Sequence, residues 1–211
     1  MKHPQTGTAA VRGPRLWLVR HAQPLVAPGT CYGALDVSAD AAATHAAAAR
    51  LAAALPGQAR VHHSTLQRCE QLARSLQALR PDLTSKPDAR LVEMDFGAWE
   101  GQAWDAIARA EIDAWTADFA RYRPGGGDNL ASVLQRVAAA LGADGSPAAS
   151  HVDHVHAPSA SGTVPDVVWI THAGVIRCVA WLRAHGSALP RSDEWPVAAP
   201  GWGEWETLGL T

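Results

Sequence analysis

The chain has 211 residues, of which 47% are hydrophobic, and a formal net charge of -2 at pH 7. This length suits one domain, or at most a domain with a small cap. The near-neutral charge gives no electrostatic reason to expect a nucleic-acid or membrane-surface partner. No stretch approaches the ~20 apolar residues that span a bilayer, so we expect a soluble protein.

The three cysteines favour a reducing compartment. Cys31, Cys69 and Cys178 are widely spaced and form no C-x-x-C pair, which argues against both a disulfide framework and a zinc site. Residues 1–14 are polar and lack the apolar core of a secretory signal. We therefore expect a disordered leader over 1–14, a single domain over 15–211 and a cytoplasmic location.

In the first part of the chain two stretches predict strands and two segments predict helices. Residues 16–19 are a short apolar run, as expected of a buried strand, and residues 61–63 predict a second short strand. Residues 38–55 are nearly all alanine, which predicts a helix with Ser38 as its N-cap. The segment after the second strand predicts a helix with one apolar face. That face carries Leu66, Cys69, Leu72, Ala73, Leu76 and Leu79.

The middle of the chain predicts one extended stretch over 83–92, a turn over 96–101 and a helix over 102–122. Glycines 125–127 break that helix. A further helix begins at Leu130 and has one of two polar N-caps. The candidates for this cap are Asp128 and Asn129.

The last third predicts a long surface loop, a buried strand and a helix. Residues 142–165 are rich in Gly, Ser, Ala and Pro, which is typical of a loop. Residues 167–170 form the clearest buried strand, and the helix over 175–185 ends at a glycine. Residues 195–208 predict one or two edge strands. Strands thus alternate with helices, which indicates an α/β fold with a sheet covered on both faces.

Basic and imidazole side chains follow three of the predicted strands. Arg20 and His21 follow the first strand, His172 follows the strand over 167–170, and Ser64 with Arg68 follows the strand over 61–63. In an open α/β sheet, ligands bind beyond the carboxyl ends of the strands, so these side chains are expected to share one pocket. Guanidinium groups suit the oxygens of a phosphoryl group, and a neutral imidazole suits nucleophilic attack on its phosphorus.

A leaving alkoxide needs a proton, and Glu93 is the candidate donor. Its apolar neighbours favour a protonated carboxyl group. Asp95, two residues along, is the local rival. Glu100 precedes a glycine at the predicted turn, where a carboxylate more often caps the following helix. A surface carboxylate without any catalytic role is the alternative interpretation of Glu93.

The ordered motifs resemble the histidine phosphatase superfamily, the group that includes phosphoglycerate mutase. They are Arg20-His21-Ala22, Ser64-x-x-x-Arg68, Glu93 and His172-Ala173-Gly174. The resemblance covers roughly residues 15–185. It implies a three-layer α/β/α fold on a mainly parallel sheet, with no metal and no cofactor.

The resemblance also implies roles for single residues. His21 matches the phosphorylated nucleophile, Glu93 the proton donor, and His172 a catalytic residue that also contacts phosphate. Arg20, Arg68 and Ser64 complete the implied phosphate site. The sequence departs from the family in three respects: the usual Arg-His-Gly-Glu and the usual Gly-Gly-Glu-Ser are both replaced, and a common Asn after the first motif is missing. The replacements are Arg20-His21-Ala22-Gln23 and Gly126-Gly127-Asp128-Asn129.

Two further stretches resemble the α-ribazole-5′-phosphate phosphatases of cobalamin biosynthesis. They are Cys31-Tyr-Gly-Ala-Leu-Asp36 and Phe96-Gly-Ala-Trp-Glu-Gly101. The aromatic residues Tyr32, Trp99 and Trp104 are candidates for stacking on a flat base, with packing in the core as the alternative. The implied partner is a small phosphorylated metabolite, bound by a monomer or homodimer. A phosphoglycerate mutase or a broad sugar-phosphate phosphatase is the alternative enzyme.

Two alternatives belong to other classes of protein. The histidines of the predicted loop suggest a metal-binding protein, although such clusters in Gly/Ser/Pro-rich loops are more often solvated. They are His151, His154 and His156. The other alternative is a catalytically inactive scaffold of the same fold.

Overall fold

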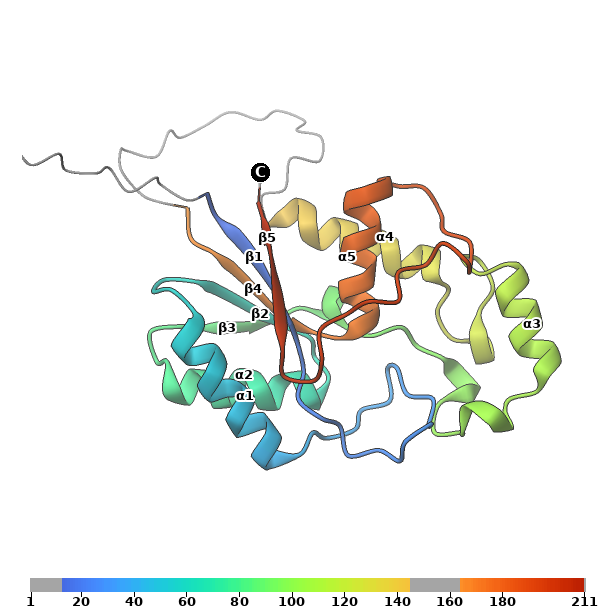
Figure 1. Ribbon diagram of the computed structural model, residues 1–211, viewed down its shortest axis with the longest axis horizontal. Coiled ribbons are helices and arrows are strands. Elements are labelled where there is room, and N and C mark those ends of the chain that lie inside the picture. Colours follow the sequence, from blue (N-terminus) through green and yellow to red (C-terminus); the bar gives the residue numbers. More distant parts are fainter. Residues whose placement is uncertain (1–12, 145–163, 211) are drawn as a thin grey trace, which may run out of the picture.

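The computed structural model describes residues 13–144 and 164–210. At its centre is a five-stranded sheet with the order β3-β2-β4-β1-β5 (Figure 1). Four strands are mutually parallel, and β5 pairs antiparallel with β1 at one edge. The strands are β1 (Arg15–Arg20), β2 (Arg60–His63), β3 (Ser85–Pro87), β4 (Val167–Thr171) and β5 (Trp205–Gly209).

Helices cover both faces of the sheet, which confirms the predicted α/β/α arrangement (Figure 1). Side chains alternate along a strand, so Leu16 and Leu18 of β1 face one core while Trp17 and Val19 face the other. The core that contains Trp17 and Val19 lies under α1 (Ala41–Ala54) and α2 (Gln67–Leu79). The core that contains Leu16 and Leu18 lies under α4 (Leu130–Ala143) and α5 (Ala173–His185).

A smaller lobe lies on the far side of α4 and α5 from β3 (Figure 1). It contains α3 (Arg109–Ala117) and several 3-10 turns. Its own small core is built on Cys31, Trp99 and Ile107. The turns of this lobe are η2 (Gly97–Trp99), η3 (Trp104–Ala106) and η4 (Pro124–Gly126), whereas η1 (Ala89–Leu91) packs against α4 and β4.

The helix predicted over 102–122 is wrong at both ends. Backbone pairing with the loop after β1 takes up residues 102–104: the Cys31 amide donates to the Gln102 carbonyl at 2.7 Å, and the Trp104 amide donates to the Gly29 carbonyl at 2.9 Å. At the other end the helix stops at Asp118, whose φ of -126° and ψ of 56° are not helical. Long-range pairing therefore overrides the local helical pattern.

Several predicted boundaries also move. Asp40, not Ser38, caps α1, because its carboxylate accepts from the Ala43 amide at 2.7 Å. The 83–92 stretch is a strand only at β3, and 195–208 gives a single edge strand that runs on to residue 209. Of the two candidate caps of α4, Asn129 accepts from the Ser132 amide at 2.8 Å.

The predicted leader and loop fall largely outside the described residues. Residues 1–12 and 145–163 are not described, but Pro14 belongs to the fold because its carbonyl accepts from the Leu210 amide at 2.9 Å. The predicted loop at 142–165 begins too early, since α4 continues to Ala143. Within the described residues, no helix is both long and apolar enough to cross a membrane.

Candidate phosphate-binding active site

The carboxyl ends of β1, β2 and β4 bring the predicted site residues together. Backbone pairing continues past the strands: the His21 amide donates to the Thr171 carbonyl at 3.0 Å, and the Ser64 amide donates to the Ile170 carbonyl at 2.9 Å. As a result, the rings of His21 and His172 lie with their centroids 5.2 Å apart. The two imidazoles predicted to share a pocket do so.

His21 is fixed as a neutral imidazole with one free nitrogen. Its side chain is buried, and Nδ1 lies 2.6 Å from the Ala22 carbonyl oxygen, so Nδ1 carries the proton and donates it. Burial first, and then the Arg68 charge, lower the pKa of His21 from 6.5 to about 3. The lone pair therefore sits on Nε2 at neutral pH, as a nucleophile requires.

His172 is held by Ser64 from behind. The Ser64 hydroxyl oxygen accepts from the Leu66 amide at 3.3 Å and lies 2.8 Å from His172 Nε2, and we assign its O–H as the donor to that nitrogen. Nδ1 of His172 then carries the proton and is the donor available to a ligand. Burial, followed by the charge of Arg68, lowers the pKa of His172 well below its ordinary value, which keeps the ring neutral.

This arrangement corrects the implied role of Ser64. The residue does not line the cavity and is fully buried behind His172. The start of α2 is not a free anion site either, because the Gln67 amide donates to Asp36 at 2.7 Å. Ser64 thus positions His172 and sets its tautomer, with no direct contact to the cavity.

The two predicted arginines are anchored by main-chain carbonyls. Arg68 is fully buried and donates from Nη1 to Leu35 at 2.8 Å and from Nη2 to Gly33 at 2.5 Å. Arg20 donates from Nη1 to Pro200 at 3.1 Å. These bonds hold each guanidinium in place while leaving further N–H groups for a ligand.

Three buried nitrogen atoms of these residues have no hydrogen-bond partner among residues 13–144 and 164–210. They are Nε of Arg20, Nε of Arg68 and Nδ1 of His172. Buried donors in folded proteins are normally satisfied, so an acceptor group from a ligand is the expected partner. All three residues line one cavity together with His21, and an oxyanion in that cavity would satisfy the donors.

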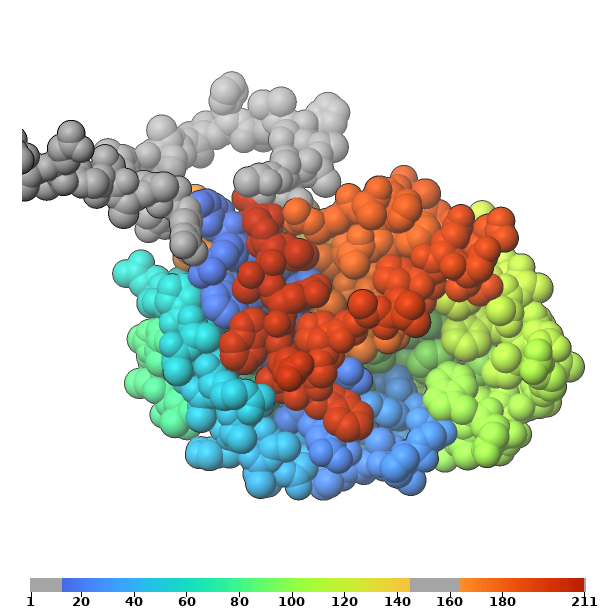
Figure 2. All heavy atoms as spheres, in the orientation of Figure 1, coloured from blue at the N-terminus to red at the C-terminus, as the bar shows by residue number. Residues whose placement is uncertain are grey.

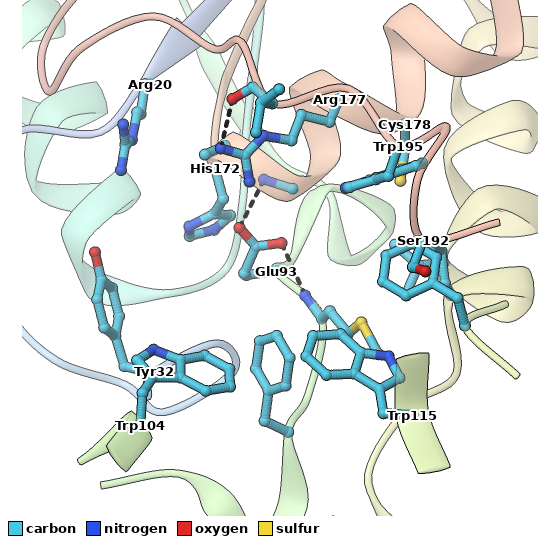
Figure 3. Close-up of a pocket in the computed structure, with 18 of the residues that line it drawn as sticks. Arg20, Tyr32, Glu93, Trp104, Trp115, His172, Arg177, Cys178, Ser192 and Trp195 are labelled. Carbon is cyan, nitrogen blue, oxygen red and sulfur yellow. Dashed lines mark hydrogen bonds between the residues drawn. The ribbon is translucent and has the colours of Figure 1, made fainter. Parts of the chain in front are cut away.

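Glu93 reaches the same cavity, whereas its rivals do not. Its carboxylate accepts from the Gly174 amide at 2.9 Å and from the Met94 amide at 3.0 Å, and Figure 3 shows it beside His172. Asp95 instead accepts from the Gly97 amide at 2.7 Å and caps its own turn. Of the three carboxylates weighed from the sequence, Glu93 alone lines the cavity.

Glu100 has a structural role other than the predicted helix cap. Its carboxylate accepts from the Phe96 amide at 2.9 Å, from the Ala34 amide at 2.8 Å and from the Leu35 amide. It thereby ties the loop after β1 to the loop that carries Glu93. Both loops contribute residues to the cavity, so Glu100 supports the site from outside it.

The cavity has a volume of about 440 Å³. Figure 2 shows the surface hollowed between the loop after β1, the α3 lobe and the segment before β5. Tyr32 and Trp104 line it, as predicted. Trp99 does not: it is 2% exposed and packs in the small core with Cys31 and Ile107, so its predicted substrate contact is wrong.

Several lining residues were not predicted as part of the site. Arg177 is one turn and a half beyond His172 on α5, and its spacing from His172 was the available signal. Trp115 and Phe119 lie in the segment predicted as a helix over 102–122, and Trp195 begins the stretch predicted as edge strands. All four line the cavity. Their convergence depends on how α3 and the segment before β5 pack, which no local pattern reports.

Metal ligands do not gather in the described part of the chain, where no group of three or more His, Cys, Asp or Glu side chains has a suitable arrangement. The predicted histidine cluster of His151, His154 and His156 lies outside the described residues.

Residues 16–200 match the histidine phosphatase superfamily (branch 1). The chain belongs to this superfamily. Its members are phosphatases or mutases, which agrees with the two histidines and two arginines around one cavity. No match is found among curated proteins.

Solved structures similar to this chain include three that cover most of it. TTHB049 from Thermus thermophilus is 28% identical with a TM-score of 0.62, and the match covers 92% of each chain. A mycobacterial glucosyl-3-phosphoglycerate phosphatase is 25% identical with a TM-score of 0.68, covering 93% of this chain and 90% of that one. A protein described as mycobacterial hydrolase 2 is 25% identical with a TM-score of 0.69, covering 93% and 82%.

Proposed function

We propose that this protein hydrolyses phosphomonoesters through a phosphohistidine at His21, without a metal ion. The observation that carries the proposal is the set of three unpartnered buried nitrogens on Arg20, Arg68 and His172 beside a neutral His21. Superfamily membership and the similarity to a phosphatase structure support it. The completeness of this set also argues against an inactive scaffold.

The geometry suits transfer in two steps. Arg20 and Arg68 neutralise the non-bridging oxygens, and His172 Nδ1–H donates to one of them. His21 Nε2 attacks phosphorus, so the P–N bond forms as the P–O bond to the alcohol breaks. Glu93 gives its proton to the departing oxygen. In the second step Glu93 takes a proton from water, and the water oxygen displaces His21 from phosphorus.

Replacing His21 with alanine tests the nucleophile. We expect His21→Ala to abolish turnover of p-nitrophenyl phosphate in EDTA and to abolish an acid-labile phosphoenzyme trapped with labelled substrate. Inorganic phosphate release by this variant at more than a trace of the wild-type rate would mean that another residue attacks phosphorus. Loss of wild-type activity in EDTA would contradict the metal-free mechanism.

For the natural substrate we propose α-ribazole 5′-phosphate, which would place the enzyme in cobalamin biosynthesis. Tyr32 and Trp104 line the cavity as expected for contacts to a flat base. A phosphoglycerate mutase or a broad sugar-phosphate phosphatase is the alternative, favoured by the similarity to the mycobacterial glucosyl-3-phosphoglycerate phosphatase. Assays of α-ribazole 5′-phosphate, 3-phosphoglycerate and sugar phosphates side by side decide between them. Mutase activity would appear as interconversion of phosphoglycerates without phosphate release.

A further inference from the structure

The cavity has two chemically different ends. The phosphate end carries Arg20, His21, Arg68 and His172, and Glu93 lies at the boundary. Beyond Glu93 the lining is mostly apolar, and it includes five aromatic residues: Phe96, Trp104, Trp115, Phe119 and Trp195. Figure 3 shows Trp104 and Trp115 on one side of this end, with Trp195 on another.

The aromatic side chains touch each other in an unbroken series. Trp104 and Trp115 are stacked with centroids 6.3 Å apart and planes 12° apart, and Trp115 stacks on Phe119 at 5.5 Å. Phe119 contacts Trp195 edge-on at 6.0 Å, and Phe96 contacts Trp104 and Trp115 edge-on. We call these five residues the aromatic wall. Because each ring is held by another, the wall keeps its shape before any ligand binds.

Packing alone does not explain this wall. Trp99 shows what a packing tryptophan looks like here: it is 2% exposed and does not line the cavity. Trp104, by contrast, is 37% exposed, and Trp115 and Trp195 are half-buried. A soluble protein seldom leaves several large rings facing one cavity unless a ligand covers them.

Two donors at this end also lack partners within the described residues. They are the buried Nε1–H of Trp115 and the buried Nε–H of Arg177. A buried indole N–H normally finds an acceptor. A ligand that combines an aromatic ring with a nitrogen or oxygen acceptor would cover the rings and supply one. A polyhydroxylated sugar would instead place its hydroxyl groups against apolar surface at a cost in free energy.

We infer that the aromatic wall is a subsite for a planar aromatic ring carried by the alcohol part of the phosphomonoester. This inference rests on the proposed phosphatase activity, but it does not depend on α-ribazole 5′-phosphate being the natural substrate. It assigns specificity to Trp115 and Trp195, which lie on α3 and on the segment before β5. The cavity of about 440 Å³ lies within the range of sites that enclose a small organic ligand.

Three primary alkyl phosphates test the subsite: propyl phosphate, 3-cyclohexylpropyl phosphate and 3-(quinolin-2-yl)propyl phosphate. Their leaving groups are similar primary alcohols, so differences in kcat/KM report binding of the ring. We expect the wild-type enzyme to prefer the quinoline ester over propyl phosphate by about 30- to 100-fold, the effect of burying one ring. The cyclohexyl ester should lie between the two, because it is apolar but cannot stack.

Single substitutions show which aromatic side chains cause the preference for the quinoline ester. Trp115→Ala and Trp195→Ala should each reduce the quinoline preference, which is the ratio of kcat/KM for the quinoline ester to kcat/KM for propyl phosphate, by about 10-fold. Trp115→Phe keeps a ring and should keep most of the preference. Trp205→Phe serves as the matched control with no change expected, because Trp205 packs against Trp17 in the core under α1 and α2 and does not line the cavity.

The outcomes separate this inference from the proposed function. If none of the esters nor p-nitrophenyl phosphate is hydrolysed, the proposed phosphatase activity is wrong. If propyl phosphate is hydrolysed but the quinoline ester gains nothing, only the aromatic subsite is wrong. A preference that survives both alanine substitutions, or that falls equally in Trp205→Phe, also overturns the subsite.

Discussion

The position of the Glu93 carboxyl group depends on a neighbouring glycine. A methyl group at Gly174 would approach Glu93 Oε1 to 2.2 Å, far closer than two non-bonded atoms allow. Because the obstacle is the end of a flexible side chain, an alanine there would displace the carboxyl group without disturbing the backbone. The motif His172-Ala173-Gly174 therefore places a histidine in the cavity and leaves space for the Glu93 carboxyl group beside it.

The proton donor can be identified from how strongly its replacement lowers kcat for poor and for good leaving groups. For an alkyl phosphate, Glu93→Gln should lower kcat by about 10²- to 10⁴-fold, the usual contribution of general acid catalysis. For p-nitrophenyl phosphate the loss should be far smaller, since that phenolate leaves without a proton. Gly174→Ala should reproduce the same selective loss, because it moves the carboxyl group away. Steady-state assays of the wild type and each variant give the loss of kcat on the alkyl phosphate and the loss of kcat on p-nitrophenyl phosphate.

Asp95→Asn is the matched control, since the Asp95 carboxylate binds its own turn and does not line the cavity. It should affect both substrates alike. A selective loss in Asp95→Asn would show that the acid is two residues along. Equal losses on both substrates for Glu93→Gln would show that Glu93 positions phosphate and does not donate a proton.

At the scale of single residues, strand ends were the reliable signal. Arg20, His21 and His172 were predicted from their places after apolar runs, and the parallel sheet brings those places to one edge. Ser64 lies at the predicted edge of the sheet, but its hydroxyl group contacts His172 and does not face the cavity. The sequence does not show this contact, because it depends on where the His172 ring packs. Trp99 was misplaced because composition cannot tell which tryptophan of a cluster faces the cavity.

At the scale of elements, a helix can be predicted where its buried face alone determines it. The prediction fails where a distant segment of the chain forms hydrogen bonds with the backbone of the same residues. Apolar periodicity predicted α2 and α4 closely, since their buried faces follow the sequence. The segment from 102 to 122 has comparable helical character, yet Gly29 and Cys31 take its first backbone groups into a bridge. No local rule reveals that competition.

The N-cap of α1 gives a quantitative test at this scale. Asp40→Ala removes the acceptor of the Ala43 amide and should cost about 1 kcal/mol of unfolding free energy. Ser38→Ala, at the cap predicted from the sequence, should change stability by less than about 0.5 kcal/mol. Urea unfolding followed by circular dichroism measures both. A larger loss for Ser38→Ala than for Asp40→Ala would mean that the helix begins two residues earlier.

At the scale of the whole molecule, the site exists only in the folded chain. Arg20, His21 and His172 lie at the ends of β1 and β4, Arg68 lies on α2, and the Pro200 carbonyl that holds Arg20 comes from the segment before β5. Phosphate would therefore bind the native state and not the unfolded chain. Ligands of this kind raise stability by mass action, and the rise reports the site even without turnover.

Anion binding should therefore raise the thermal midpoint of unfolding. At phosphate or vanadate concentrations about 100 times the Kd, linkage gives about 2.7 kcal/mol, or about 5–10 °C for a chain of this size. Vanadate should act at lower concentration than phosphate, because its five-coordinate form resembles the transition state. The rise in the thermal midpoint should be unchanged in EDTA and lost in Arg20→Gln. Arg74→Gln is the control and should keep the rise, because the Arg74 side chain is exposed and pairs with Glu70. A shift that persists in Arg20→Gln, or that needs a divalent metal, would place the anion elsewhere and remove the basis for metal-free phosphoryl transfer at His21.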